Sequence, residues 1–176
     1  MQQTPYDEHR ATYTRQALAR LVLSDHATDV ADSAAGLVGT RHDADTGFGG
    51  RVSQAKQLAE QVERALVSAV VYEVERGSSW AQIGDYLGVG ADEARERYSP
   101  ALDAWNTALE EPYRLDETGR KRIPQLPTAA YDPAWACRQL DGWAFLRHIG
   151  IDDRHAVSAG LVRSGAADEP DPATDH

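Results

Sequence analysis

Apolar residues recur at steps of three and four along residues 51–76, the longest regular pattern in the chain. This spacing predicts one face of an α-helix of about seven turns, which Gly77 is expected to end. The residues of this face are Val52, Ala55, Leu58, Ala59, Val62, Leu66, Ala69, Val70 and Val74. We expect the helix to be the spine on which both halves of the chain pack. In the alternative, its upper part also forms a dimer seam, although the flanking positions do not enforce a strict heptad.

The segment before this helix carries weaker patterns. Residues 1–8 have no period and are expected to be loose, whereas residues 9–25 have a partly apolar face and predict a helix. A second short helix is expected over residues 28–37, capped by its first or second residue. Residues 39–50 are rich in glycine and aspartate and predict a loop.

Prolines divide the second half of the chain. Ser99 and Pro100 fit the cap and first residue of a helix that ends before Pro112, and its Trp105 is expected to cover the core of the segment before it. Residues 124–133 predict an extended connection.

Asp132 and Pro133 then predict the start of a further helix, which ends near residues 148–150. Its Trp135 and Trp143 are expected in the core. One more short helix is expected over residues 151–163. From residue 164 onward Gly, Ala, Asp, Glu and Pro dominate, which predicts a disordered acidic tail.

Residues 79–98 predict two short helices joined by a tight turn. Ser79 can cap the first helix, and Gln82, three residues later, can complete a capping box. Gly88 stands where the chain needs a positive φ, and Gly84 stands where the second helix must approach closely. These are the features of a helix-turn-helix, whose second helix can enter the major groove of DNA.

The run Trp80-x-x-Ile83-Gly84-x-x-Leu87-Gly88-Val89 resembles the helix-turn-helix core of small actinobacterial DNA-binding proteins. The resemblance extends over about residues 66–105 and implies a DNA-binding role. Members of that family usually continue with Ser or Thr, Arg, Gln, Ala, Ala and a basic stretch. Here Ala91 and Asp92 occupy the expected Arg and Gln positions, so the expected reading surface differs from that of the family.

In the second helix Ala94 and Tyr98 share one face, which is expected to point inward. Arg95 on the outer face can donate two hydrogen bonds to a guanine, and Asp92 or Glu96 can accept from a cytosine. The predicted DNA-contacting residues of the motif are Ser79, Gln82, Ala91, Asp92, Arg95, Glu96, Arg97 and Ser99.

Residues 113–124 predict a short hairpin around an Asp-Glu-Thr-Gly turn. Arg114, Arg120, Lys121 and Arg122 form its basic patch. Two interpretations stand side by side: a wing that rests on DNA phosphates, or a solvated turn with ordinary surface charge.

The charge of the chain argues against general affinity for nucleic acid, because the formal net charge is −10. Residues 58–99 hold four basic and eight acidic groups, a balance of −4. We therefore expect binding to double-stranded DNA to be weak, highly specific or assisted by a partner. A homodimer would double the few basic contacts. The alternative function is a protein-interaction module whose acidic face binds a basic partner or covers the DNA-binding surface of another regulator.

Other function classes find little support in the sequence. There is no Ser-His-Asp arrangement, cofactor loop or metal-ligand spacing, so we expect neither an enzyme nor a cofactor or metal. His42, Asp43 and Asp45 are expected to be solvated loop residues. A single Cys137 excludes an internal disulfide and fits a reducing cytoplasm, and no run of about 18 apolar residues indicates a membrane helix.

Together the patterns predict a mainly α protein: a multi-helix bundle around a long central helix, with a helix-turn-helix and a short β-hairpin. The expected divisions are an N-terminal helical segment and Gly-rich loop (1–50), the long helix with the helix-turn-helix (51–111), the basic hairpin with C-terminal helices (112–163) and the tail (164–176).

Overall fold

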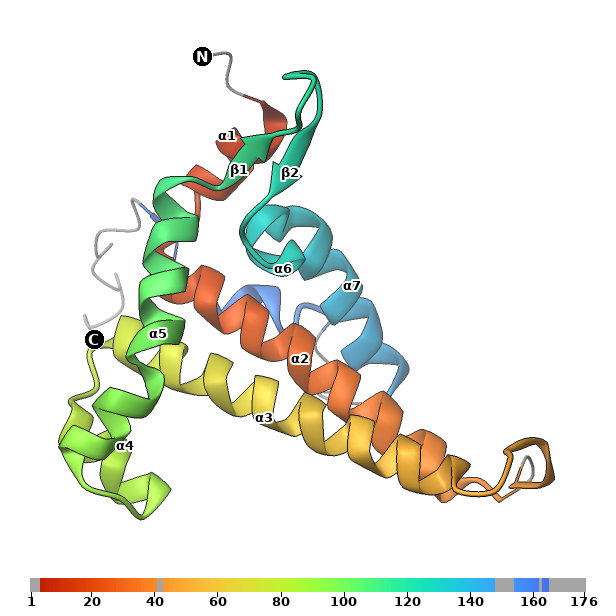
Figure 1. The fold of residues 1–176 in the computed structure, drawn as a ribbon. Coiled ribbons are helices and arrows are strands. Elements are labelled where there is room, and N and C mark those ends of the chain that lie inside the picture. Colours follow the sequence, from red (N-terminus) through yellow and green to blue (C-terminus); the bar gives the residue numbers. More distant parts are fainter. Residues whose placement is uncertain (1–3, 41–42, 148–153, 162, 165–176) are drawn as a thin grey trace, which may run out of the picture.

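The computed structural model describes residues 4–40, 43–147, 154–161 and 163–164. These residues form a mainly helical fold with one small antiparallel hairpin, as the sequence predicts (Figure 1). The α-helices are α1 (Pro5–Ala11), α2 (Arg15–Val38), α3 (Gly50–Arg76), α4 (Trp80–Leu87), α5 (Ala91–Glu110), α6 (Thr128–Tyr131) and α7 (Pro133–Leu146). The strands are β1 (Tyr113–Leu115) and β2 (Arg122–Pro124), and 3-10 turns lie at η1 (Asp43–Asp45) and η2 (Ser158–Gly160).

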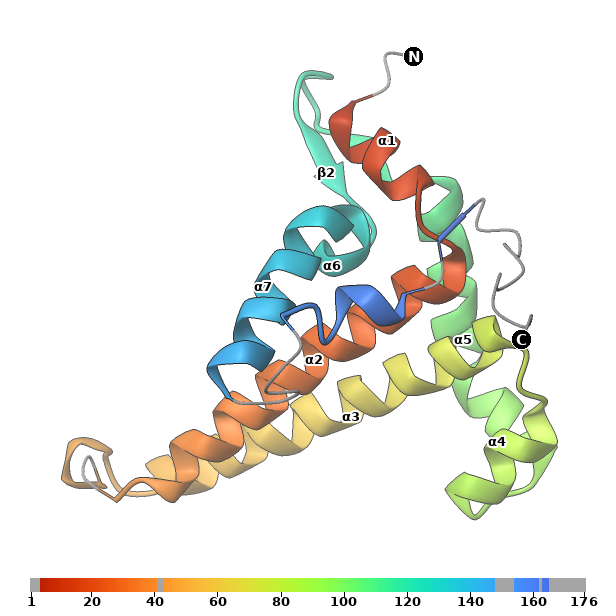
Figure 2. The same ribbon diagram turned by 180° about the vertical axis from the view of Figure 1, so that it is seen from behind.

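Helices α2 and α3 lie side by side as a long antiparallel hairpin whose tip projects beyond the other elements (Figures 1 and 2). Helix α3 has the predicted bounds to within one residue, and Gly77 ends it at φ 98°. Helices α6 and α7 pack on α2, while α4 and α5 pack on the C-terminal part of α3. The expectation of a central spine is confirmed, but α2 and α3 form it together.

The N-terminal helices begin and end at other residues than predicted. Thr4 and Asp7 form a capping box that starts α1 within the segment expected to be loose. Thr14 then caps α2, which runs without a break over 24 residues. Thr28, a candidate cap, instead lies inside α2 and donates a hydrogen bond to the carbonyl of Asp25 at 2.7 Å. The expectation of two separate helices here is therefore wrong, because the hydroxyl of Thr28 satisfies a helical carbonyl.

The helix that Pro100 was expected to start is the second half of α5, which is continuous from Ala91 to Glu110. Ser99 does not act as a cap, since its hydroxyl donates to the carbonyl of Arg95 at 2.7 Å. Pro100 lacks an N–H and removes one helical hydrogen bond. Burial of Tyr98 and Trp105 on either side of Pro100 offsets this loss and keeps the helix in one piece.

Two hydrophobic clusters meet at α3. Val70 packs with Ile83 and Tyr98 in the cluster beneath the helix-turn-helix. The next residue, Val71, belongs to the larger cluster formed by α2, α3, α5, α6 and α7. Trp105 also lies in the larger cluster, so the expectation that it covers the helix-turn-helix core is wrong. The reason is that α5 is long enough for its two halves to pack on different cores.

Helix α7 starts at the predicted place, where Asp132 accepts a hydrogen bond from the backbone N–H of Trp135 at 3.0 Å. Its buried face consists of Ala136, Cys137, Leu140 and Ala144. Trp135 is 39% exposed, and half-buried Trp143 donates its indole N–H to Asp32 at 3.2 Å. The expected core role of these two tryptophans is wrong, because the small residues of α7 let it approach α2 closely and leave the large rings at the rim.

The last described residues return to the N-terminal part of the fold. Ser158–Gly160 forms only a 3-10 turn within the range predicted as a short helix. Arg163 then pairs with Tyr13 in an isolated antiparallel bridge, and Leu161 joins the larger cluster. Helix α6 lies within residues 124–133, where an extended connection was expected. The predicted tail beyond Ser164 and the predicted end of α7 at 148–150 lie outside the described residues.

Candidate nucleic-acid interface

Helices α4 and α5 and the turn between them have the predicted helix-turn-helix form. The capping box is closed: the Ser79 N–H donates to Gln82 Oε1 at 2.9 Å, and the Gln82 N–H donates to Ser79 Oγ at 3.3 Å. Gly88 follows α4 at φ 71°, which is the left-handed conformation that glycine adopts at least cost. The Val89 N–H then donates to the carbonyl of Gly84 at 3.0 Å and closes the turn.

Gly84 is the point of closest approach between α4 and the segment that starts α5. A Cβ at this position would lie 2.7 Å from the carbonyl oxygen of Val89 and 3.2 Å from the carbonyl carbon of Gly90. Both contacts are backbone atoms that cannot rotate away. The predicted need for a small residue here is therefore a geometric fact of the turn.

The inner face of the motif is buried as expected. Ala94 is fully buried and Tyr98 is 2% exposed, and Tyr98 meets Ile83 of α4 and Val70 of α3. Helix α3 thus serves as the third helix of a compact three-helix unit, with half-buried Trp80 at its edge. This packing fixes the direction of the outer face of α5.

The outer face of α5 is open to solvent. Asp92, Glu93, Arg95, Glu96 and Arg97 are all exposed, and no described part of the chain covers them. The guanidinium of Arg95 forms no hydrogen bond or ion pair with the described residues, so it is available to a ligand. Coverage of this face by another part of the chain would have ended the DNA-binding interpretation, and the described residues provide none.

The other predicted contacts of α5 are less favourably placed. Arg97 donates to Glu63 of α3 at 3.0 Å and lies over the Tyr98 ring at 5.1 Å, so a phosphate would compete with these contacts. Half-buried Ser99 uses its hydroxyl inside the helix, and Ala91 is half-buried. In α4, the capping box occupies Oε1 of Gln82, while its amide nitrogen forms no hydrogen bond with the described residues.

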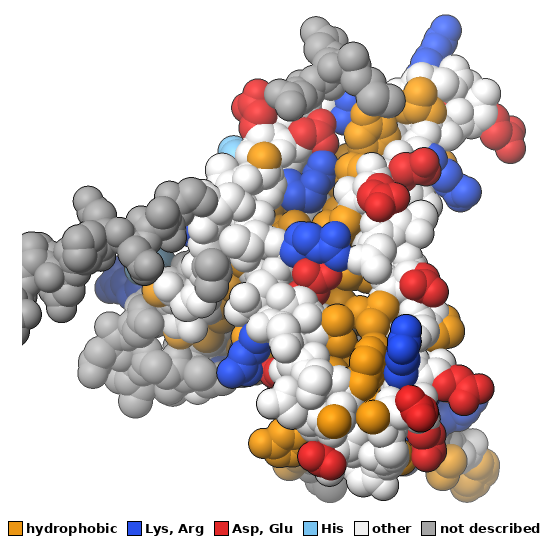
Figure 3. All heavy atoms as spheres, turned by 90° about the vertical axis from the view of Figure 1, so that its left-hand side faces the viewer, with side chains coloured by type: hydrophobic (Ala, Val, Ile, Leu, Met, Phe, Trp, Pro, Cys, Tyr) orange, Lys and Arg blue, Asp and Glu red, His pale blue; other side chains and the backbone are white. Residues whose placement is uncertain are grey.

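The two helices of the motif also carry exposed carboxylates. Asp85 on α4 and Asp92, Glu93 and Glu96 on α5 are all exposed. Figure 3 shows acidic side chains at the lower end of the molecule, where α4 and the start of α5 lie. Asp92 and Glu93 stabilise the first turn of α5 through the helix dipole, but near phosphates they repel. Within the described residues, the motif therefore carries four exposed carboxylates and one arginine, Arg95, that forms no ion pair.

The outer face of α4 adds a residue that the sequence analysis missed. Tyr86 is 94% exposed, although it is a large aromatic side chain. Trp80, Ile83, Gly84 and Leu87 form the inward face of α4, and Tyr86 lies more than a quarter turn from the centre of that face. A helical wheel of the motif would have identified it as a surface aromatic.

The predicted hairpin is formed, with Arg114 opposite Ile123 in the register. Its turn is organised by Asp116, which accepts backbone hydrogen bonds from Lys121 at 3.1 Å and Arg120 at 3.0 Å, while Gly119 has φ 70°. The hydrogen bond from the Lys121 backbone, with the others, lowers the pKa of Asp116 below its ordinary value.

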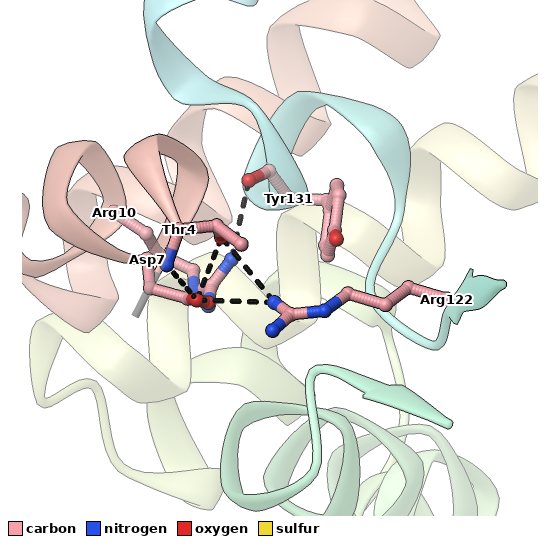
Figure 4. Close-up of polar contacts among 5 residues, drawn as sticks. All are labelled: Thr4, Asp7, Arg10, Arg122 and Tyr131. Carbon is pink, nitrogen blue, oxygen red and sulfur yellow. Dashed lines mark hydrogen bonds and ion pairs between the residues drawn. The ribbon is translucent and has the colours of Figure 1, made fainter. Parts of the chain in front are cut away.

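Arg122 does not belong to a solvent-facing basic patch. Its guanidinium lies over the Tyr113 ring at 4.0 Å and donates to Thr4 and Asp7 of α1, each at 3.3 Å (Figure 4). Asp7 also receives the Arg10 guanidinium at 2.5 Å. Hydrogen bonds from Thr4, Arg10 and Arg122 hold the pKa of Asp7 well below its usual range. Arg122 therefore joins the hairpin to α1, while Arg114, Arg120 and Lys121 are exposed.

The hairpin and the start of α5 lie at opposite ends of that helix (Figures 1 and 2). With 20 residues in α5, the separation is about 30 Å along its axis. The hairpin is therefore not a wing beside the second helix of the motif. The structure splits the predicted DNA-contacting residues into two groups, one on the motif and one on the hairpin.

Other kinds of site find no support among the described residues. No group of three or more His, Cys, Asp or Glu is placed to hold a metal ion within them, and Asp43 of the predicted loop pairs with Arg51. His42 lies outside the described residues. In the described part of the chain, every helix is too short or too polar to cross a membrane.

No protein-family model, curated protein or solved structure matches this chain. The resemblance to small actinobacterial DNA-binding proteins therefore rests on the sequence pattern alone, which is centred on residues 80–89.

Proposed function

We propose that the protein is a DNA-binding transcriptional regulator that inserts the N-terminal half of α5 into the major groove. The observation that carries the proposal is the open outer face of a closed helix-turn-helix, with the unpaired Arg95 guanidinium on it. Arg95 would donate to guanine O6 and N7, and Asp92 or Glu96 would accept from cytosine N4.

The charges on the outer face of α5 favour sequence-specific binding over non-specific binding to DNA. Since Arg97 is held by Glu63 and the carboxylates of α5 repel phosphate, non-specific affinity from this face is small. Discrimination between sequences then depends on the base contact of Arg95, and loss of one such bidentate contact costs about 1–3 kcal/mol.

The test compares Arg95→Ala with Arg64→Ala. Arg64 is an exposed arginine on α3 that forms no ion pair with the described residues, so it is a control for removing one charge. Fluorescence anisotropy would measure binding to the DNA upstream of the gene and to a shuffled duplex at several salt concentrations. We expect Arg95→Ala to remove the preference between the two duplexes and Arg64→Ala to keep it. An unchanged preference in Arg95→Ala would refute the proposed reading role.

A protein-interaction module is the second candidate, and the four exposed carboxylates on α4 and α5 favour it. Replacing Asp92, Glu93 and Glu96 by Asn, Gln and Gln separates the two candidates. If the face binds DNA, the neutral variant binds all duplexes more tightly, because repulsion is removed. If neither form binds DNA while the wild type alone binds a basic helix-turn-helix regulator, the face is a protein-binding surface.

A further inference from the structure

Helix α3 presents an apolar stripe that no described part of the chain covers along its N-terminal half. Val52 is 73% exposed and Val62 is 48% exposed, and Ala55 and Ala59 between them are also exposed. The stripe continues through half-buried residues toward the helix-turn-helix. Its members, which we call the α3 stripe, are Val52, Ala55, Ala59, Val62, Leu66 and Ala69.

These six residues follow one another at steps of three, four, three, four and three. That is the spacing of the a and d positions of a coiled coil, over two and a half heptads. The face that packs on α2 is a different one, as shown by Ser68, which bonds His26 of α2 at 2.8 Å. Single exposed apolar residues are common on protein surfaces, but apolar residues with heptad spacing along one helix indicate a binding surface.

We propose that the α3 stripe pairs with the same stripe of a second copy of this chain, with the two α3 helices antiparallel. Such a contact is self-complementary and closes as a two-fold dimer. This inference stands whether or not the protein binds DNA.

The sizes of the side chains select the antiparallel orientation. When the midpoints of the two stripes are aligned, Val52 of one copy meets Ala69 of the other. In the same register Ala55 meets Leu66, and Ala59 meets Val62. Every layer then pairs one alanine with one larger residue, so the layers have similar volumes and pack evenly. A parallel pair would place alanine on alanine and leucine on leucine, leaving gaps beside crowded layers.

Charge complementarity selects the same orientation. Lys56 and Glu63 flank the stripe on one side and are 78% and 54% exposed in their side chains. Antiparallel helices bring Lys56 beside Glu63 of the partner subunit, and the symmetry repeats this pair. A parallel pair would place these flanks of the two copies on opposite sides of the contact, so that Lys56 could not reach Glu63 of the partner subunit. Within the chain Lys56 pairs with Glu60 at 3.4 Å and Glu63 pairs with Arg97 at 3.0 Å. Both contacts are exposed, and each leaves the ammonium or the carboxylate able to bind a second partner.

A groove lies where the end of the second α3 would arrive. It has a volume of about 720 Å³ and lies between α3 and α4, lined by Leu66, Ala69, Ile83 and Tyr86 among others. In the proposed register Val52 and the preceding loop of the second copy reach this groove. Phe48 in that loop is fully exposed in the single chain and would there find apolar contacts.

The dimer also has a geometry that suits a duplex. Val67, Val70 and Val74 of α3, which pack on the helix-turn-helix, lie about a quarter turn from the stripe. Since the two-fold axis is perpendicular to the plane of the two α3 helices, both helix-turn-helix units lie on the same side. The two copies of Val70 would be about 30 Å apart along the helices, close to the ~34 Å between half-sites one DNA turn apart.

Oxidative cross-linking of the full chain tests the pairing and its direction. Two proteins are prepared, one with Ala55→Cys and one with Leu66→Cys, while the native Cys137 is buried. We expect a disulfide-linked dimer when the two are mixed and little when either is oxidised alone. Rapid cross-linking of Ala55→Cys alone would show parallel helices and overturn the proposal, as would the absence of any link.

Sedimentation velocity supplies the second measurement. Ala59→Glu adds a carboxylate to the stripe, whereas Gln57→Glu adds the same group at an exposed position on another face of α3. We expect wild type and Gln57→Glu to dimerise, and Ala59→Glu to raise the dissociation constant at least about tenfold. A wild type that stays monomeric at about 100 μM, or an Ala59→Glu variant that dimerises as tightly as Gln57→Glu, would overturn the proposal.

Discussion

The close approach at Gly84 provides the sharpest test of the helix-turn-helix geometry. Gly84→Ala places a methyl group 2.7 Å from the carbonyl oxygen of Val89 and 3.3 Å from the backbone nitrogen of Ala91. Neither atom belongs to a flexible side chain, so relief requires that the turn move away from α4. The matched control is Gly142→Ala in α7, where an added Cβ meets nothing within 4 Å.

The expected magnitude follows from two opposing terms. Alanine is favoured over glycine inside a helix by about 0.8–1.0 kcal/mol, and this gain applies to both variants. Overpacking of a filled site costs about 1–3 kcal/mol, and it applies to Gly84→Ala alone. We therefore expect Gly142→Ala to be up to about 1 kcal/mol more stable than wild type and Gly84→Ala to be less stable than Gly142→Ala by about 1–3 kcal/mol.

Urea unfolding followed by far-UV circular dichroism measures both free energies of unfolding. Because the propensity term is common to both variants, their difference isolates the steric cost. If Gly84→Ala is as stable as Gly142→Ala, the two helices do not approach as closely as described, and the position of the outer face of α5 is wrong.

Two further predictions concern the contact between the hairpin and α1. Arg122→Ala should lower the free energy of unfolding by about 1–2 kcal/mol, because it removes bonds to Thr4 and Asp7, whereas exposed Arg120→Ala should stay within about 0.5 kcal/mol of wild type in the same urea assay. Asp7→Asn should be destabilising at neutral pH. Because folding lowers the pKa of Asp7, the ionised carboxylate adds its full contribution to the free energy of unfolding above the pKa of the unfolded chain, near ~3.9. This contribution is lost as the pH falls through the lower pKa of Asp7 in the folded protein. Unfolding curves of wild type and Asp7→Asn should therefore converge at acidic pH, and a constant difference would contradict the assignment.

The helix-turn-helix could be predicted from the sequence because its determinants are local. Ser79 and Gln82 are three residues apart, and Gly84 and Val89 are five apart. All four lie within residues 79–89. Such signals depend on hydrogen bonds and backbone angles that involve only a few neighbouring residues. The same holds for the end of α3 at Gly77 and the cap of α7 at Asp132.

Helix boundaries were predicted less well where local signals compete with packing. Pro100 is a helix-start signal by itself, yet α5 continues through it because its neighbours are buried on both sides. Trp135 and Trp143 are large and apolar and were expected inside, but alanines of α7 take the buried face. Burial depends on how closely two helices approach, which no single segment determines.

The sequence by itself determined the helical class, the hairpin and the two-helix motif, since each follows from spacings of a few residues. Only the tertiary structure showed that Arg122 binds α1, that the hairpin lies at the far end of α5 and that no described residue covers the N-terminal half of the α3 stripe. These facts relate segments up to 118 residues apart. Their distances are set by the packing of α2, α3 and α5 as rigid helices, and periodicity within one helix shows only which of its faces is apolar.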